Sequence, residues 1–589
     1  MTKQRDLGQR LVPLLLALMI ALPAFVAPLA AGPDAVAGHR QSDVYTALWD
    51  IDYVADSLAD GHLPLRTNRI AFPRGGLLFP SKPIVAAIAA PLRAVFGLNA
   101  AYNITVWLLL AVGFLGAFRL AERLTGSRVG GLVAGVGFGL SPFMTCYATA
   151  SGATEILGLG FLPWALLYLE RVADGPSRGG VVGLAVSLAL TLISGAYVAV
   201  LAAVALAVWL VLLPFRRKKT TGVSLDRAGW LRVAFGLLGG ALLASPFLFA
   251  LAWTLRSADS MLAATGFAAI RPAPPWVDFA PGASSYYAAG LLDYWRPHVA
   301  RIAEGSLFAK TVTLTFGITI LALAGVIYRA RQVMGWVIAA LLLMVLSTGP
   351  YLLLTAKVGL PWPANPVYLA GYYLVPPLRW FLEPFRFGQA AMLFAALAAA
   401  AGAAALVEKF GRRGGFVGGL CVLAALVEIA LLAAPFWRAD DLARAPSSEE
   451  VTQAARQSAG AVVELPFFDP ENPDLLRRDR FANQVWHGRP IVDSITGFLP
   501  PFVTRNGLLA RLAKLENAGV EVDVRQTAAQ GAQDLRAAGV AALVVDVCAY
   551  RHMRPEAVNT VRRLLEEGGV VADDVTVIGE CTNLVRLSH

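Results

Sequence analysis

The sequence predicts a mostly α-helical protein, a polytopic transmembrane helix bundle with a small C-terminal α/β domain outside the membrane. Hydrophobic residues make up 57% of the 589 residues, charged residues only 15%, and the mean hydropathy is +0.60. Long apolar runs recur along most of the chain, and after Trp437 the composition changes to that of a soluble domain. A chain this long and this apolar is typical of a polytopic membrane protein.

The N-terminus combines a basic start, with Lys3, Arg5 and Arg10, and an apolar run. The run has roughly twenty residues, which is long enough to cross a bilayer. Small residues at 30–32 also fit the cleavage site of a signal peptide. Both interpretations place the chain from His39 onward outside the cytoplasm, and we favour an uncleaved first helix.

Residues 1–435 are expected to form the transmembrane domain, with about eleven spans. The further apolar runs are 99–122, 129–147, 155–172, 179–195, 196–214, 231–255, 311–328, 333–355, 387–407 and 415–435. Residues 84–97 are also apolar, but this run is short and contains Pro91 and Arg93. We therefore expect it to lie along the membrane interface or to dip into it.

Lys and Arg residues set the expected orientation, because cytoplasmic loops carry an excess of them. In alternate loops they are Lys3, Arg5, Arg10, Arg119, Arg123, Arg128, Arg171, Arg178, Arg216, Arg217, Lys218, Lys219, Arg329, Arg331, Lys409, Arg412 and Arg413. This distribution predicts a cytoplasmic N-terminus. It places loops 32–98, 148–154, 256–310 and 356–386 outside, together with everything after Pro435.

Residues 436–589 are predicted to form one extracytoplasmic α/β domain, because this length is normal for a single domain. Residues 461–467 and 540–547 have the apolar pattern of buried strands, and 508–515 and 556–565 have helical spacing. The last residues of the chain fit two strands joined by a turn.

The four cysteines fall into two groups. Cys548 and Cys581 lie in the domain placed outside, where the compartment permits a disulfide. Two cysteines alone do not establish a pair, so this disulfide is a hypothesis. Cys146 and Cys421 lie in apolar runs and are expected to be small core residues.

The sequence lacks the motifs of several functional classes. The chain has no GxxxxGK[ST] loop, which disfavours a nucleotide-driven pump, and no GxSxG, HExxH or EF-hand motif. The formal net charge of +10 is distributed over short loops between apolar runs, so it does not indicate a nucleic-acid partner. No inverted repeat is evident, which disfavours a secondary transporter.

The first extracytoplasmic loop, residues 32–98, concentrates acids beside the membrane. In SDVYTALWDIDYVADSLADG they are Asp43, Asp50, Asp52, Asp56 and Asp60. Asp43 and Asp50 share a face if the segment is helical. One carboxylate of such a pair can act as a base toward an acceptor hydroxyl, while another holds a cation or the acceptor. For Asp56 and Asp60 we favour helix capping or solvation.

Charged residues elsewhere on the outer side are further candidates. Glu155 is expected at the outer end of a membrane helix, where an ionisable group is costly; the alternative is an interface residue that reaches water. Arg379 and Arg386 flank Glu383 just before a span. Guanidinium groups bind phosphate well, so these arginines are candidates for a lipid phosphate; the alternative is a pair of interfacial anchors.

The outer loops 256–310 and 356–386 are rich in Trp, Tyr and Pro. Such rings lie at the level of the lipid headgroups, and long non-repetitive loops often carry function; the alternative is an aromatic belt with solvated turns. The rings around Arg379 and Arg386 are able to hold an isoprenoid chain. Lys82, His298 and Glu304 are weaker candidates, because a lone polar residue in an outside loop is usually solvated. Of these, Lys82 and His298 are candidates for binding the donor phosphate.

Short motifs over nearly the whole chain carry a family resemblance. They are SDVYTALW at 42–49, GHLPL at 61–65, FPRGG at 72–76, PLRAVFGLNAAYN at 91–103, RLAERLTGSR at 119–128, SPF at 141–143, LPWALLYLERV at 162–172, STGP at 347–350, EPFRF at 383–387, ELPF at 464–467 and HGRPIVDSITGF at 487–498. In this order they resemble the GT-C superfamily of polytopic glycosyltransferases, which use polyprenyl-phosphate-linked sugars. The resemblance is greatest to a bacterial branch with an added C-terminal extracytoplasmic domain.

The resemblance implies roles for several residues. In GT-C enzymes an acid in the first outside loop is the usual catalytic base, and Asp43 fits that position. Asp50 and Asp52 resemble accessory acids that assist acceptor or metal binding, which leaves a divalent metal ion open as a cofactor. Where a Gly-His pair is expected after the third span, this chain has SGATE, ending at Glu155. No role is therefore carried over from that histidine.

We expect an inverting GT-C glycosyltransferase, a hexosyl- or pentosyltransferase of the bacterial cytoplasmic membrane. Its partners would be a polyprenyl-phosphate sugar donor, membrane lipids, and a glycan, lipid or protein acceptor. Asp43 would deprotonate or orient the acceptor hydroxyl. Two alternatives remain: a transporter or flippase of lipid-linked glycans, and a non-catalytic envelope assembly protein with the same fold.

Overall fold

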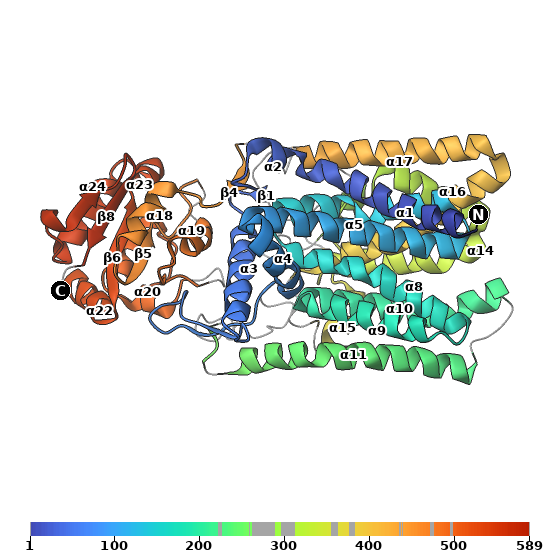
Figure 1. Ribbon diagram of the computed structural model, residues 1–589, viewed down its shortest axis with the longest axis horizontal. Coiled ribbons are helices and arrows are strands. Elements are labelled where there is room, and N and C mark those ends of the chain that lie inside the picture. Colours follow the sequence, from blue (N-terminus) through green and yellow to red (C-terminus); the bar gives the residue numbers. More distant parts are fainter. Residues whose placement is uncertain are drawn as a thin grey trace.

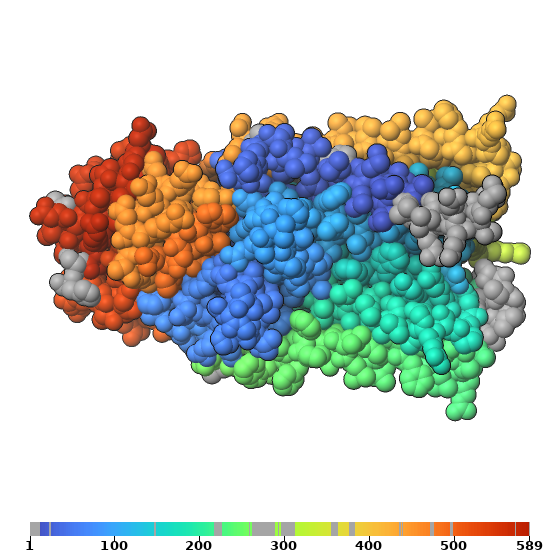
Figure 2. Space-filling view, in the orientation of Figure 1, coloured from blue at the N-terminus to red at the C-terminus, as the bar shows by residue number. Residues whose placement is uncertain are grey.

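The computed structural model is elongated, with a helix bundle at one end and a smaller α/β unit at the other (Figure 1). It describes residues 2–221, 226–257, 259–261, 289–295, 312–354, 363–375, 378, 383–434, 438, 440–471, 476–494 and 499–587. In the space-filling view the C-terminal residues, orange to red, lie against one end of the bundle, beside the blue first loop (Figure 2). We call this end of the bundle the domain end.

The described residues from the N-terminus to residue 434 are mostly helical. The α-helices are α1 (Thr2–Ala21), α2 (Val26–Ala31), α3 (Val44–Ala59), α4 (Pro83–Phe96), α5 (Leu98–Thr125), α6 (Arg128–Ala134), α7 (Ala148–Ala150), α8 (Leu162–Asp174), α9 (Arg178–Ile193), α10 (Ala196–Thr221), α11 (Arg227–Arg256), α14 (Phe316–Ser347), α15 (Pro366–Leu374), α16 (Phe387–Phe410) and α17 (Arg412–Ala433). Short 3-10 or π segments are η1 (Leu22–Phe25), η2 (Gly135–Gly139), η3 (Phe143–Tyr147), η4 (Thr154–Phe161), η7 (Leu291–Tyr294) and η9 (Pro384–Arg386).

The helices confirm the predicted polytopic membrane fold. Within the described residues, 7 helices are long and apolar enough to cross a membrane. They are Leu98–Thr125, Thr154–Asp174, Ala196–Arg216, Arg227–Arg256, Phe316–Ser347, Pro384–Phe410 and Arg412–Ala433. Shorter apolar helices cover Val12–Ala21, Pro83–Phe96, Arg128–Gly139 and Arg178–Ile193. Most of the predicted apolar runs thus appear as helices, some of them shorter than a full span.

One of these helices, α14, reverses its direction at Arg329, where φ is −135° and ψ is 35°. Just before α14, the Leu314 N–H donates to the Tyr294 carbonyl at 2.7 Å. At its other end, Ser347 Oγ bonds the Tyr294 hydroxyl at 2.7 Å. A straight helix of 32 residues would be about 48 Å long, so both ends reach one tyrosine only because the chain turns back. The two spans predicted between 311 and 355 are therefore two antiparallel segments.

Small residues let α16 occupy the interior of the bundle. In its most apolar stretch 89% of the residues are buried, against 22% in α11, which lies at one edge of the bundle (Figure 1). A Cβ on Gly402 would lie 1.9 Å from the Leu321 carbonyl oxygen of α14. The backbones of α14 and α16 approach closely because glycine and alanine line this contact.

The C-terminal unit contains a four-stranded sheet in the order β5-β6-β8-β7. Its strands are β5 (Ala461–Leu465), β6 (Val540–Asp546), β7 (Val575–Val577) and β8 (Thr582–Arg586), and its helices are α18 (Glu449–Arg456), α19 (Asp479–His487), α20 (Pro501–Arg505), α21 (Leu509–Glu516), α22 (Ala528–Ala537), α23 (Val547–Met553) and α24 (Ala557–Glu567), with a 3-10 turn η11 (Ala572–Asp574). β5 and β6 are parallel, and the other pairs are antiparallel. The strands and helices predicted in this region are all present.

The first loop and the C-terminal unit share backbone hydrogen bonds. β1 (Ala35–His39) pairs antiparallel with β4 (Leu442–Arg444), while β2 (Arg66–Thr67) and β3 (Gly76–Leu77) form a hairpin within the loop. Beside this hairpin, the Ile491 N–H donates to the Arg69 carbonyl at 2.9 Å, and the Phe72 N–H donates to the Ile491 carbonyl at 3.1 Å. The loop that carries the predicted site is therefore built into the C-terminal unit.

A disulfide joins Cys548 in α23 to Cys581 just before β8, with a Cα–Cα distance of 5.0 Å. The two cysteines are 33 residues apart in the sequence. A cross-link that closes a loop of this length restricts the unfolded chain.

Replacing both cysteines, Cys548→Ser with Cys581→Ser, is expected to destabilise the C-terminal unit by about 2–4 kcal/mol because the unfolded chain regains its freedom. Thermal unfolding of the purified protein, with and without reductant, measures this effect. Reductant should lower the melting temperature of the wild type and of a Cys421→Ser control, but not of the double variant. Equal melting of the wild type and the double variant would contradict the prediction.

Candidate functional site

Asp43 stands at the start of α3 and is held there by the loop around Gly152. The Asp43 N–H donates to the Ser151 carbonyl at 2.9 Å. A Cβ at Gly152 would lie 2.1 Å from the Val44 nitrogen, and the φ of Gly152 is +66°. Only glycine fits such a close approach without strain. Contact with this loop thus sets the position of Asp43.

The Asp43 carboxylate pairs with Arg478 of the C-terminal unit, and its side chain is 32% exposed. Its position before the first turn of α3 suits a negative charge, because helix N-termini carry partial positive charge. Asp43 is thus a partly accessible carboxylate at the junction between the bundle and the C-terminal unit.

A buried cluster of charges lies close to Asp43. Arg386 Nη1 is 3.1 Å from Glu155 Oε1, and the Arg386 Nε pairs with Glu383. The guanidinium carbon of Arg386 also lies 4.3 Å from the centre of the Tyr197 ring. Burial raises the pKa of Glu383, Arg386 opposes this rise, and the carboxylates of Glu155 and Asp43 add to it. The structure thus brings together Asp43, Glu155 and Arg386.

Asp50 and Lys82 connect α3 to the residues directly before α4. Asp50 Oδ2 accepts from Ser81 N at 2.9 Å, Ser81 Oγ at 2.6 Å and Lys82 N at 3.0 Å. Lys82 Nζ donates to Thr46 Oγ1 at 2.9 Å, and both Asp50 and Lys82 are buried. Burial raises the pKa of Asp50, and Lys82 opposes this rise. These contacts join the two helices, and they direct the Asp50 carboxylate to α4.

Asp52 and Asp56 belong to an ion-pair network on another part of α3. Asp52 pairs with Arg69 and with Arg93. Asp56 lies 3.1 Å from Arg69 and 2.7 Å from Arg93, so it does more than the expected capping or solvation. Arg69 also donates to Gln484 Oε1 in the C-terminal unit at 3.2 Å. This network attaches α3 to its surroundings.

Other predicted site residues have no described position. His298, Arg379 and Glu304 lie outside the described residues, so their proposed contacts with a donor remain predictions. Sequence reasoning did not single out Arg478 or Tyr197. The sequence signal for Arg478 is the charged run RRDR at 477–480, whereas Tyr197 has none.

The carboxylates that the structure describes at the site are held by other partners and are not grouped around a metal position. Within the described ranges, no group of three or more His, Cys, Asp and Glu side chains is arranged to hold a metal ion. Asp43, Asp52 and Glu155 each pair with a guanidinium group, and Asp50 accepts three hydrogen bonds. A divalent ion would have to displace these partners. The residues thus do not fit this cofactor, and we derive no step through it.

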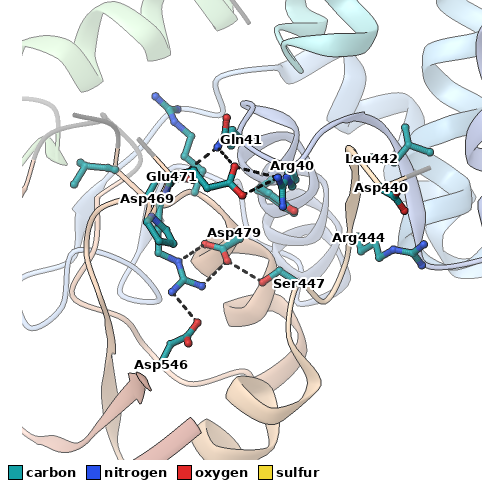
Figure 3. A pocket seen from close by; sticks show the side chains of 15 residues that line it. Arg40, Gln41, Asp440, Leu442, Arg444, Ser447, Asp469, Glu471, Asp479 and Asp546 are labelled. Atoms are coloured by element: carbon teal, nitrogen blue, oxygen red, sulfur yellow. Dashed lines mark hydrogen bonds and ion pairs between the residues drawn. The ribbon is translucent and has the colours of Figure 1, made fainter. Parts of the chain in front are cut away.

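A polar cavity of about 330 Å³ lies beside the Asp43–Arg478 pair, between the first loop and the C-terminal unit. Figure 3 shows Arg40 and Gln41 from the loop turned toward Glu471, with Asp479 below them. Arg478 belongs both to the cavity wall and to the ion pair with Asp43. The cavity thus borders the predicted site.

Gly152→Ala is expected to displace the start of α3, because the added Cβ meets the Val44 backbone. The expected loss of stability exceeds about 1 kcal/mol, since the native φ is also unfavourable for alanine. Thermal unfolding in detergent measures it. Gly179→Ala is the control, because a Cβ there has nothing within 4 Å. An unchanged melting temperature in Gly152→Ala would contradict the proposed packing.

Arg386→Gln is expected to destabilise the protein by about 3–5 kcal/mol, because Glu155 and Glu383 lose their buried cationic partner. The variant should regain stability as the pH falls. The folded-state pKa of Glu383 lies above its unfolded value, so the folded state binds the proton more tightly and is favoured at lower pH.

Thermal unfolding at pH 8 and pH 5.5 tests this pH dependence. The deficit of Arg386→Gln relative to the wild type should narrow at the lower pH, and a second change, Glu383→Gln, should remove most of the deficit. If neither the lower pH nor Glu383→Gln reduced the loss of stability in Arg386→Gln, the carboxylates would not be its cause.

Comparisons with known proteins identify the fold. No protein-family model and no curated protein matches the chain. Among solved structures, the arabinofuranosyltransferase AftD from Mycobacteria matches with a TM-score of 0.56 and 17% identity over 98% of this chain. The oligosaccharyltransferase of Archaeoglobus fulgidus matches with a TM-score of 0.50 and 12% identity, covering 95% of this chain and 72% of its own.

ArnT from Cupriavidus metallidurans matches along its whole length, with 99% of this chain and 98% of ArnT covered, a TM-score of 0.50 and 13% identity. The chain spans only 41% of the length of AftD. Likeness at these identities shows the fold, and it agrees with the motifs and the membrane helices described above. The protein therefore has the polytopic fold of the GT-C membrane glycosyltransferases.

Proposed function

We propose that the protein transfers a sugar from a polyprenyl-phosphate-linked donor to an acceptor outside the cytoplasm. The observation that carries this proposal is the position of Asp43. This acid stands in the first loop of a GT-C fold, partly accessible, between the apolar bundle and a polar surface of the C-terminal unit. A base in this position can meet a lipid-linked donor from one side and a polar acceptor from the other.

The proposal includes an orientation for the protein in a bacterial cytoplasmic membrane. Residues 1–435 form its transmembrane domain, with the N-terminus inside, and residues 436–589 form the extracytoplasmic domain. The distribution of Lys and Arg supports this orientation. The Cys548–Cys581 disulfide supports it as well, because disulfides persist in oxidising compartments.

In the proposed reaction, Asp43 accepts the proton of an acceptor hydroxyl while that oxygen attacks the anomeric carbon of the donor. The bond between the anomeric carbon and the phosphate oxygen breaks, and its electron pair stays with the lipid phosphate. The phosphate leaves from the face of the sugar opposite to the attacking oxygen. A new glycosidic bond forms with inverted configuration. General base catalysis contributes about 10²–10⁴-fold, and stabilisation of the departing phosphate is the larger effect.

Arg386 is the described cation best placed to receive that phosphate. It is buried near Asp43 and already has two carboxylate partners, so a donor phosphate would take the place of one of them. The raised pKa of Glu383 favours this exchange, because a protonated Glu383 no longer competes as an anion. Lys82 would contribute through a rearrangement, since its amine now bonds Thr46.

Asp43→Asn tests the proposal in membranes supplied with radiolabelled polyprenyl-phosphate hexose and pentose. The expected loss of transfer is at least about 100-fold, because the amide does not accept the proton. Asp60→Asn, the same change at the exposed C-terminal end of α3, is the matched control and should retain activity.

Two results would contradict the proposal. Full transfer activity in Asp43→Asn would remove this residue as the base. Uptake of labelled lipid-linked glycan into proteoliposomes by the wild type, without a transferred product, would instead support the transporter alternative.

A further inference from the structure

The cavity beside Arg478 has walls from both parts of the protein. The first loop contributes Arg40, Gln41 and Tyr45, and the segment around β4 contributes Leu442 and Ser447. The remaining wall comes from the residues before and at the start of α19, and from Asp546 at the end of β6. A space of about 330 Å³ lies at the lower end of the range for small-molecule sites, about 300–1,000 Å³. It has room for one or two sugar rings.

Most of the charged groups in the cavity wall form ion pairs. Arg40 lies 2.8 Å from Glu471, and Arg477 lies 2.7 Å from Asp479 and 3.3 Å from Asp546. Figure 3 shows the Arg40–Glu471 pair and, below it, Asp479 and Asp546. The lining contains the cations Arg40, Arg444, Arg477 and Arg478 and the anions Asp440, Asp469, Glu471, Asp479 and Asp546. It therefore has no excess of positive charge to offset a phosphate or a carboxylate.

This wall offers hydrogen-bond donors and acceptors side by side. Guanidinium groups only donate and ionised carboxylates only accept, whereas a hydroxyl group does both. Burial opposes ionisation of Asp479, but Arg477, Arg480 and Ser447 together outweigh burial and lower the pKa of Asp479, so this carboxylate stays an acceptor. A ligand rich in hydroxyl groups and without charge matches such a surface better than an anion does.

Arg478 connects the cavity with the proposed base. Arg478 lines the cavity, and its guanidinium group pairs with the Asp43 carboxylate. A ligand that contacts Arg478 in the cavity would therefore be separated from Asp43 by the length of one side chain. We propose that the cavity binds an uncharged carbohydrate portion of the acceptor and that Arg478 links this site to Asp43. This inference rests on the proposed transfer of a sugar and names the class of its acceptor.

Binding to an array of neutral, acidic and amino oligosaccharides tests the inference with the full-length protein in detergent and without any donor. The wild type should bind neutral members. Gln41→Trp should weaken that binding at least tenfold, because an indole would fill much of the cavity. Gln41→Ala is the matched control. It removes the hydrogen bonds to Glu471 and Asp469 without filling the space and should weaken binding less than threefold.

Binding of acidic or amino oligosaccharides in preference to neutral ones would overturn the inference, and so would the absence of binding to any member. Equal binding by the wild type and Gln41→Trp would also overturn it, with thermal unfolding used to confirm that the variant is folded. These outcomes leave the proposed function standing if Asp43→Asn still abolishes transfer. Failure of the transfer assay itself would instead remove the proposed function.

Discussion

The pairing of the first loop with the C-terminal unit is the constraint on which the candidate site depends. The β1–β4 ladder and the backbone hydrogen bonds of Arg69 and Phe72 with Ile491 hold the first loop, and with it α3, against the C-terminal unit. α3 carries Asp43 at its start, and Arg478 directly precedes α19. Their ion pair thus exists because two segments more than 400 residues apart form one structure. Backbone hydrogen bonds set this geometry, while the ion pair itself is partly exposed and adds little stability.

Side chains strengthen the same contact at a second point. Trp49 Nε1 donates to Gln484 Oε1 at 2.8 Å, and Trp49 is fully buried. Gln484 also accepts from Arg69, which pairs with Asp52. A buried amide with several partners tolerates little displacement, because each lost partner leaves an unsatisfied polar group. α3 is consequently fixed to the C-terminal unit along its length as well as at its start.

Local patterns in the sequence predicted the helices and strands because these depend on neighbouring residues. The apolar runs, the buried strands β5 and β6 and the reversal at Arg329 were all visible as composition and charge. The pairing of Asp56 with Arg69 and Arg93 was not, since a solvated acid and a paired acid look alike in sequence. Arg478 was missed for a related reason: its partner is 435 positions earlier in the chain, and no local pattern connects them.

The charges around Asp43 also favour the neutral acceptor that we propose. Three carboxylates, Asp43, Glu155 and Glu383, share the guanidinium groups of Arg386 and Arg478. The cluster is therefore short of one positive charge if every acid is ionised, and a donor phosphate adds another negative charge. The raised pKa of Glu383 allows one proton to compensate. An anionic acceptor would add a further negative charge beside this cluster, whereas an uncharged carbohydrate would leave the electrostatics of the proposed donor site unchanged.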